Sequence, residues 1–118
     1  MTTECPKLNH EMLDSYQVSI EFLATAVEVL NKFPKGYHSA SDQLQRASLS
    51  IPLNIAEGYG KRMRKDRARF YDIARGSAHE CGAILDSLRV LQIIDLPSYI
   101  KGKTLLHRIV SMLVKMCS

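Results

Sequence analysis

Tryptophan is absent from this chain of 118 residues, and Phe and Tyr together make up only 7% of it. A hydrophobic core must therefore be built from Leu, Ile, Val, Met and Ala. The apolar content of 46% and the charged content of 24% are those of an ordinary globular protein and exclude a disordered chain. The length favours one domain and leaves little room for a second.

Cysteine is scarce as well, with Cys5, Cys81 and Cys117 far apart and no CxxC pair among them. An odd number at such spacing predicts no disulfide framework and indicates a reducing compartment, the cytoplasm. Cys81 falls on an apolar stripe, so we expect it to fill the core as a small apolar side chain.

Long hydrophobic runs are also missing. The first twelve residues, MTTECPKLNHEM, contain no apolar signal-peptide core, so secretion is not expected. No stretch approaches the roughly 20 apolar residues that a membrane-spanning helix needs, so we expect no membrane partner.

Strict alternation of apolar and polar residues does not occur, whereas apolar residues recur about every 3.5 positions along the whole chain. This spacing predicts four amphipathic helices, at about residues 9–33, 40–57, 65–94 and 98–116. Because the connections between them are short, we predict an all-α fold, an antiparallel up-down-up-down four-helix bundle that forms a single domain over residues 1–118.

Each predicted helix has an apolar stripe that we expect to face the core. The stripes are Leu13, Tyr16, Ile20, Leu23, Val27 and Leu30; Leu44, Ala47, Ile51 and Ile55; Phe70, Ala74, Ser77, Cys81, Ile84, Leu88 and Leu91; and Leu105 or Leu106, Ile109, Met112 or Leu113, and Met116. Further apolar residues lie off the stripes, namely Val18, Phe22, Val29, Leu49 and Leu53. This surplus predicts a widened core and allows a buried interface between subunits.

Several residues predict where the helices begin, end or bend. Ser39 or Ser41 is the expected N-cap of the second helix, Pro52 predicts a kink within it, and Gly58 is its expected C′ residue. In the third helix, the small residues from Gly76 to Ala78 predict a close approach by a neighbouring helix.

The positive charge of the chain is concentrated in one short segment. The net charge is +4, from 16 basic and 12 acidic residues, yet without residues 61–69 the chain has ten basic and eleven acidic residues. Six cations make up this segment, which we call the basic block: Lys61, Arg62, Arg64, Lys65, Arg67 and Arg69. Such a local block favours a basic patch over a uniformly basic surface.

The basic block has three possible roles. It can contact nucleic-acid phosphates, with Arg62, Lys65 and Arg69 on one helical face and with Tyr59 and Tyr71 stacking on unpaired bases. It can be a solvated segment that aids solubility. In an oligomer it can instead pair with a neighbour's acidic row, which Asp14, Glu21 and Glu28 form at seven-residue spacing along the first helix.

The segments RASLSIPLNIAEGYGKR and FYDIARGSAHECGAIL, between residues 46 and 85, resemble a known family. It comprises small four-helix-bundle proteins encoded in intervening sequences of bacterial large-subunit ribosomal RNA genes, often labelled ribosomal-protein-like. The matching residues include Pro52, Asn54, Glu57, Gly58, Gly76, Ser77 and Glu80. The same superfamily includes the accessory proteins of diversity-generating retroelements, which work beside a reverse transcriptase.

The resemblance implies a pentameric ring of bundles and an association with RNA or another nucleic acid rather than catalysis. This chain departs from the family after Gly60, where relatives commonly have a serine-containing turn and this chain reads KRMRKDRARF. A serine cap for the third helix is therefore missing.

Catalytic and metal-binding roles are not predicted. Glu57 and Glu80 lie on neighbouring antiparallel helices, but no base, nucleophile or cofactor motif accompanies them, so we expect Asn54, Glu57, Ser77 and Glu80 to form a structural polar network. A di-metal bundle needs Glu-x-x-His sets, which this sequence does not have, so we expect no metal and no cofactor.

These observations predict a non-catalytic bundle that binds RNA or belongs to a ribonucleoprotein, acting as a homopentamer through its basic block. Two alternatives stay open. One is a retroelement accessory protein that binds a reverse transcriptase and its template RNA. The other is a structural bundle with no nucleic-acid role.

Overall fold

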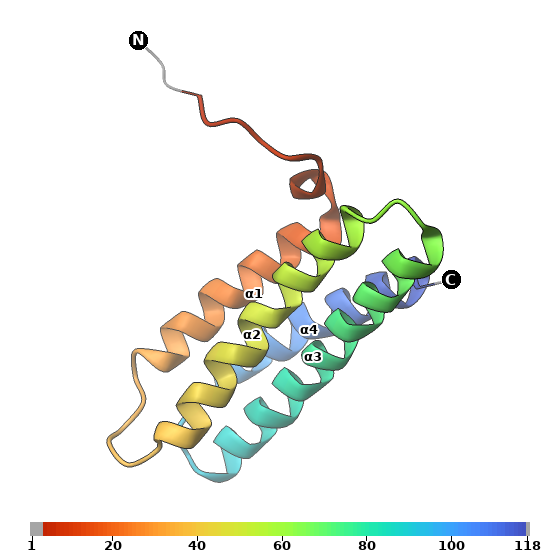
Figure 1. Ribbon diagram of the computed structural model, residues 1–118. Coiled ribbons are helices and arrows are strands. Elements are labelled where there is room, and N and C mark those ends of the chain that lie inside the picture. Colours follow the sequence, from red (N-terminus) through yellow and green to blue (C-terminus); the bar gives the residue numbers. More distant parts are fainter. Residues whose placement is uncertain (1–3, 118) are drawn as a thin grey trace.

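A computed structural model of the chain describes residues 4–117, and residues 1–3 and 118 lie outside it. The described part consists of a short 3-10 helix, η1 (Asn9–Met12), followed by α1 (Asp14–Leu30), α2 (His38–Tyr59), α3 (Arg64–Val90) and α4 (Leu96–Met116). It contains no strand, and each helix runs opposite to the one before it (Figure 1). The predicted all-α four-helix fold is confirmed.

Each helix packs against two others. Both α1 and α3 contact α2 and α4, so α1 and α3 lie diagonally across the bundle from each other. The surface over α1 and α2 is consequently on the opposite side of the bundle from the surface over α3 and α4.

The first helix begins five residues later than predicted. Leu13 has extended backbone angles (φ −71°, ψ 130°) and separates η1 from α1. The backbone N–H of Leu8 donates to Glu11 Oε2 at 2.6 Å, and this contact closes the 3-10 turn ahead of the break. At the other end, α1 finishes at Leu30 instead of continuing to residue 33.

The core face of α1 differs from the predicted stripe. Ile20 and Val27 are 41% and 44% exposed. The residues that face the core are Ser15, Val18, Ser19, Phe22, Thr25, Ala26 and Val29. Three residues that we expected as surplus, Val18, Phe22 and Val29, therefore lie on the core face with Ala26 and three hydroxyl side chains. Leu13, Tyr16 and Leu30 of the predicted stripe are partly buried against the core.

The buried hydroxyls of α1 are tolerated because each has a hydrogen-bond partner. Ser19 donates to the carbonyl of Tyr16 at 2.6 Å, and Thr25 donates to the carbonyl of Glu21 at 3.2 Å. A buried hydroxyl costs little once it is bonded in this way. The ring of Phe22 lies close to Gly102 of α4, where a Cβ would stand 3.6 Å from Phe22 Cε1.

The core faces of the other helices follow the predicted stripes more closely. Leu44, Ala47, Ile51 and Ile55 of α2 are all buried, as predicted. Cys81 is fully buried in α3, and burial raises the pKa of its thiol to about 12. Leu91 is 45% exposed, contrary to prediction, because α3 has already ended at Val90.

The connection between α3 and α4 explains why α3 ends four residues early. Gln92 has a positive φ of 59°, its N–H donates to Arg89 O, and the N–H of Ile93 donates to Leu88 O at 2.9 Å. These two bonds form a Schellman motif. Asp95 then caps α4, since its side chain accepts a 2.8 Å hydrogen bond from the N–H of Ser98.

The caps predicted for α2 were wrong. Tyr37 is the N-cap, without a side-chain hydrogen bond, and the helix runs through Pro52 and Gly58 to Tyr59. Gly58 is required inside the helix because α3 approaches closely there: a Cβ on Gly58 would lie 2.8 Å from Tyr71 Cε1.

The small-residue patch in α3 does not mark a close approach at Gly76. A Cβ on Gly76 would meet no atom within 4 Å, and the residue is exposed. The glycine that α4 needs for packing is Gly102, where a Cβ would lie 2.7 Å from Leu85 Cδ1.

Two glycine-to-alanine substitutions should have opposite effects on stability. Gly76→Ala should raise the free energy of unfolding by about 1 kcal/mol, because it improves helix propensity in open space. Gly58→Ala should lower it by about 1–2 kcal/mol, because the new methyl group presses on the ring of Tyr71. Urea unfolding followed by circular dichroism measures both, and a stabilised Gly58→Ala protein would contradict the assigned contact.

Candidate nucleic-acid interface

The basic block lies at one end of the bundle, where α2 turns into α3 (Figure 1). The N-terminal segment leaves the bundle at the same end. Lys61 and Arg62 belong to the connection, and Arg64, Lys65, Arg67 and Arg69 belong to the first turns of α3. Arg62 precedes the helix, so the prediction that it shares a helical face with Lys65 and Arg69 was wrong.

Two cations of the block hold the connection together. Arg67 is half-buried, its Nε donates to the carbonyl of Lys61 at 2.6 Å, and its guanidinium lies 5.3 Å from the ring centre of Tyr59. Lys61 Nζ lies 3.5 Å from Glu57 Oε2. No pattern in the sequence distinguishes Arg67 from its neighbours, because its role depends on the folded turn.

The other four cations of the block are exposed: Arg62, Arg64, Lys65 and Arg69. The guanidinium of Arg69 lies 5.2 Å from the ring centre of Phe70, within the range of a cation–π contact. These four side chains form the part of the basic block that can reach a ligand, and we call them the exposed cations.

The tyrosines beside the block are not placed to stack on bases. Tyr71 is only 5% exposed, and its pKa is raised, chiefly by burial, while the nearby Arg67 opposes the shift. Tyr59 is half-buried, and Arg67 lies over its ring. The prediction that Tyr71 stacks on unpaired bases was therefore wrong.

The start of α3 has no side-chain cap, as the sequence predicts. Its N-cap is Met63, which makes no side-chain hydrogen bond to the first turn. Cations near a helix N-terminus oppose the helix dipole, and Asp66 in the first turn offsets this only in part. An anion bound at this end of α3 would relieve that repulsion.

The polar residues of the resembling motif separate into two groups. Ser50 Oγ and Ser77 Oγ lie 2.8 Å apart, and Asn54 Nδ2 donates to Ser50 Oγ at 2.9 Å, so these three residues link α2 to α3. Glu57 and Glu80 are exposed. They do not meet, because the Ser50–Ser77 contact aligns the antiparallel helices so that Glu57 lies near the connection, about three turns from Glu80.

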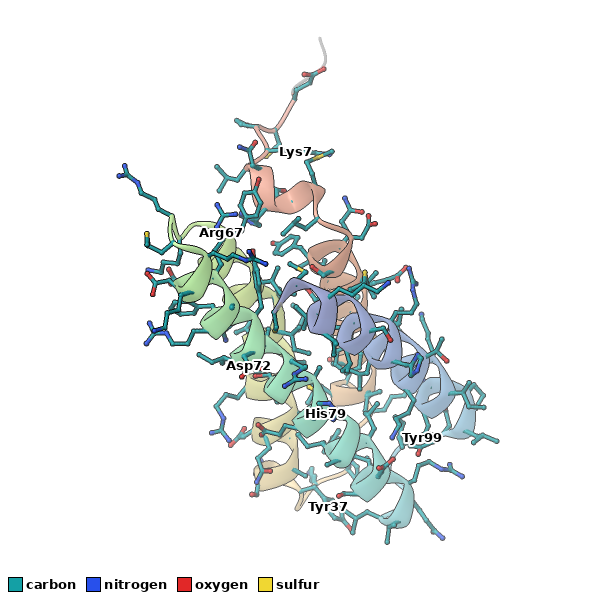
Figure 2. The ribbon with its side chains drawn as sticks, turned by 90° about the vertical axis from the view of Figure 1, so that its right-hand side faces the viewer. Lys7, Tyr37, Arg67, Asp72, His79 and Tyr99 are labelled. Atoms are coloured by element: carbon teal, nitrogen blue, oxygen red, sulfur yellow. The ribbon has the colours of Figure 1, made fainter. Side chains whose placement is uncertain are left out.

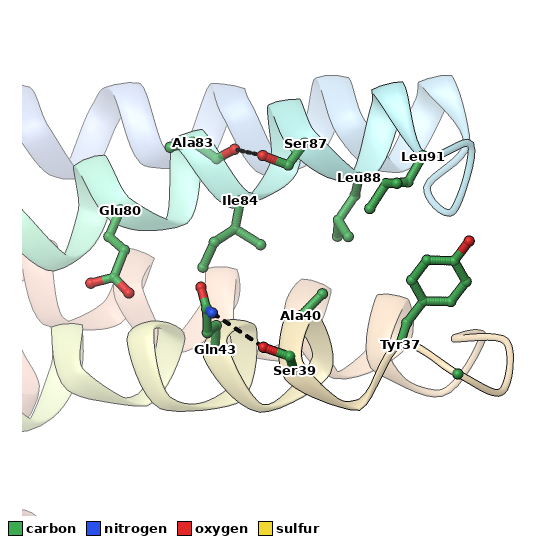
Figure 3. A pocket seen from close by; sticks show the side chains of 11 residues that line it. Tyr37, Ser39, Ala40, Gln43, Glu80, Ala83, Ile84, Ser87, Leu88 and Leu91 are labelled. Carbon is green, nitrogen blue, oxygen red and sulfur yellow. Dashed lines mark hydrogen bonds between the residues drawn. The ribbon is translucent and has the colours of Figure 1, made fainter.

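Glu80 instead lines a groove at the far end of the bundle from the basic block (Figure 3). The groove has a volume of about 450 Å³, and its apolar floor includes Ala40, Ile84 and Leu88. Gln43 Nε2 donates to Ser39 Oγ at 3.5 Å on one wall. The groove is thus separate from the exposed cations and contributes nothing to a phosphate site.

The acidic row of α1 is exposed and lies beside basic residues of the same chain. Ser15 contacts Met116 at 3.3 Å, which sets α1 against α4, and Glu21 lines a recess together with Arg108. This alignment places the acidic row along a row of α4 cations at the same seven-residue spacing, formed by Lys101, Arg108 and Lys115. The acidic row therefore has cations nearby without a second subunit.

Neither a metal cluster nor a membrane-spanning helix is found in the described chain. Among residues 4–117, no three His, Cys, Asp or Glu side chains gather closely enough to hold a metal ion. None of the helices in this range is long and apolar enough to cross a membrane.

Comparison with known proteins gives a family and a fold. A family model described as 23S rRNA-intervening sequence protein matches residues 11–115. A crystal structure of a protein with unknown function from the S23 ribosomal protein family of Bacteroides thetaiotaomicron superposes with a TM-score of 0.81. It is 23% identical to this chain, and the match covers 88% of this chain and 98% of that one. A comparison with curated proteins found no match.

Replacing Arg67 should affect stability far more than replacing Lys65. Arg67→Ala removes the hydrogen bond to Lys61 O and the contact with Tyr59, and should lower the free energy of unfolding by about 1–2 kcal/mol. Lys65→Ala, at an exposed position, should change it by less than about 0.5 kcal/mol. Equal effects in urea unfolding would show that Arg67 does not anchor the connection.

Proposed function

The chain belongs to the 23S rRNA-intervening sequence protein family, and from that premise we propose that it binds RNA or another nucleic acid without catalysing a reaction. The observation that supports this proposal is the set of exposed cations at one end of the bundle. Arg62 belongs to the connection that Arg67 and Lys61 hold in place, and the other three belong to the first turns of α3. The described surface therefore presents several cations from a fixed base.

Contact would be made with phosphates rather than with bases. Arg and Lys side chains neutralise backbone phosphates without reading sequence. The uncapped start of α3 adds a favourable site for negative charge among the same cations. Since Tyr71 is buried and Tyr59 is covered by Arg67, base stacking contributes little, and the expected binding is insensitive to sequence.

We also propose that the protein acts as a ring of five copies, as its family resemblance implies. Five chains of net charge +4 would give about +20 per ring and repeat the exposed cations around it. Repetition converts a weak contact into useful avidity, because each further contact of the same RNA becomes intramolecular.

Neutralising exposed cations should weaken RNA binding and its dependence on salt. We expect the triple variant Arg62→Gln, Lys65→Gln and Arg69→Gln to bind single-stranded RNA more weakly in all sequences alike. The slope of log K against log salt concentration should fall by about 2, at roughly 0.7 for each phosphate that the variant no longer neutralises. Filter retention across a salt series measures both quantities.

A matched control carries the same loss of charge elsewhere. Lys32→Gln, Lys35→Gln and Arg46→Gln remove three exposed cations outside the basic block and should leave the salt slope unchanged. If the unmodified protein retains no RNA or DNA at about 50 mM salt, nucleic-acid binding is not its function.

Light scattering tests the ring. The purified protein should have a molar mass of five times the 13.3 kDa of one chain. A stable monomer at the protein concentration of the measurement would contradict the ring proposal. The phosphate contacts of a single chain would then still be tested by the salt series.

A further inference from the structure

The groove that Glu80 lines follows the contact between α2 and α3 at the end of the bundle far from the basic block (Figure 3). On α3 its lining extends from Glu80 to Leu91, which is about 16 Å of helix at about 1.5 Å per residue. We call it the α2–α3 groove. The two helices meet closely at Gly58, but here they leave a slot as long as about three turns of a third helix.

The lining of the α2–α3 groove is mostly apolar. Ile84 and Leu88 form its floor and are buried. Leu91 and Tyr37 lie at the end away from Glu80 and are 45% and 37% exposed. Ile84, Leu88 and Leu91 follow each other at spacings of four and three residues, which is the spacing of side chains along a contact between two helices. The gaps between such side chains accept the side chains of a further helix.

The polar side chains of the groove already have partners within their own helices. Ser87 Oγ donates to the carbonyl of Ala83 at 2.9 Å, and Gln43 Nε2 donates to Ser39 Oγ at 3.5 Å. An extended peptide laid on this floor would leave backbone N–H and C=O groups without partners, which costs free energy. A helix pairs its own backbone groups, so a helix is the form of chain that fits the groove.

Glu80 gives the α2–α3 groove one charged end. It is exposed, and the other lining residues that the structure describes carry no charge. Among residues 4–117 no cation forms an ion pair with Glu80, not even Arg46, which lies one turn beyond Gln43 on α2. The carboxylate is therefore complementary to a Lys or Arg of an occupant, and it repels a nucleic acid.

We propose that the α2–α3 groove binds an amphipathic helix of a different protein, which carries apolar side chains at spacings of four and three residues and a Lys or Arg at the end that meets Glu80. The length of the groove, its apolar floor and its single carboxylate together define this partner. The apolar side chains enter between Ala40, Ile84 and Leu88. The cation fixes the direction of the helix, because only one end of the groove is negative.

This contact goes beyond nucleic-acid binding and is independent of it. None of the exposed cations lines the α2–α3 groove. Figure 2 shows Tyr37, which lines the groove, at the opposite end of the bundle from Arg67 of the basic block. One copy of the protein can therefore hold a helix at one end and a nucleic acid at the other.

Two synthetic peptides that differ at one position test the groove by fluorescence anisotropy. Each has about 15 residues, long enough for an isolated helix to form, with Leu at spacings of four and three residues. The lysine probe has Lys beside its last Leu, and the glutamate probe has Glu there. The unmodified protein should bind the lysine probe about 5-fold more tightly, because an exposed ion pair replaces a repulsion between like charges.

Variants of the protein test whether the probes lie in the groove. Glu80→Lys should reverse the preference between the two probes. Ser87→Arg puts a long side chain across the groove and should weaken the binding of both probes about 10-fold. The matched control, Ser111→Arg, makes the same exchange on α4, outside the groove, and should leave both affinities unchanged. All three positions are exposed, so the variants should fold, which circular dichroism checks.

The proposal is overturned if the unmodified protein does not bind the lysine probe, if it binds both probes equally, or if Ser87→Arg binds them as the unmodified protein does. Light scattering adds a check on the occupant. If Ser87→Arg changes the molar mass in solution and Ser111→Arg does not, a second copy of this chain fills the groove, and the proposed partner is wrong. Weaker probe binding at an unchanged molar mass supports the proposal.

Discussion

The close contact between α2 and α3 at Gly58 determines how the rest of this structure is arranged. The ring of Tyr71 lies where a side chain on residue 58 would stand, so the two helices approach closely just before the chain reverses. The connection can then be short, and Arg67 can reach back to the carbonyl of Lys61. The position of every exposed cation follows from this one approach, because the cations belong to the connection and to the turn that it begins.

The fold could be predicted from the sequence because its strongest signals are periodic. Four apolar repeats near 3.5 residues, separated by short breaks, leave few arrangements other than a bundle. The rotation of α1 could not be predicted in this way. Its core face places Ser19 and Thr25 among Val18, Phe22 and Val29, and these hydroxyls are acceptable there because backbone carbonyls accept their hydrogen bonds. A hydrophobicity pattern cannot detect that compensation.

The sequence predicts which residues make up the basic block, because the excess of positive charge lies in residues 61–69. It does not predict which of these cations anchor the connection and which are exposed, because that depends on contacts made only in the folded chain. Glu57 and Glu80 share a motif but not a location, since the register of α2 on α3 places them about three turns apart. The acidic row could be found from the sequence, yet only the folded bundle shows that Glu21 lines a recess together with Arg108 of α4 in the same chain.

The unequal capping of the helices bears on the order in which the bundle opens. The described start of α4 is closed by Asp95, whereas α3 starts at Met63 without a side-chain cap and with cations beside it. Amide protons in the first turn of α3 should therefore exchange with solvent sooner than those of α4, since local opening there costs less free energy. The chain thus concentrates its positive charge beside an uncapped helix start, and a polyanion bound there would also act as the missing cap.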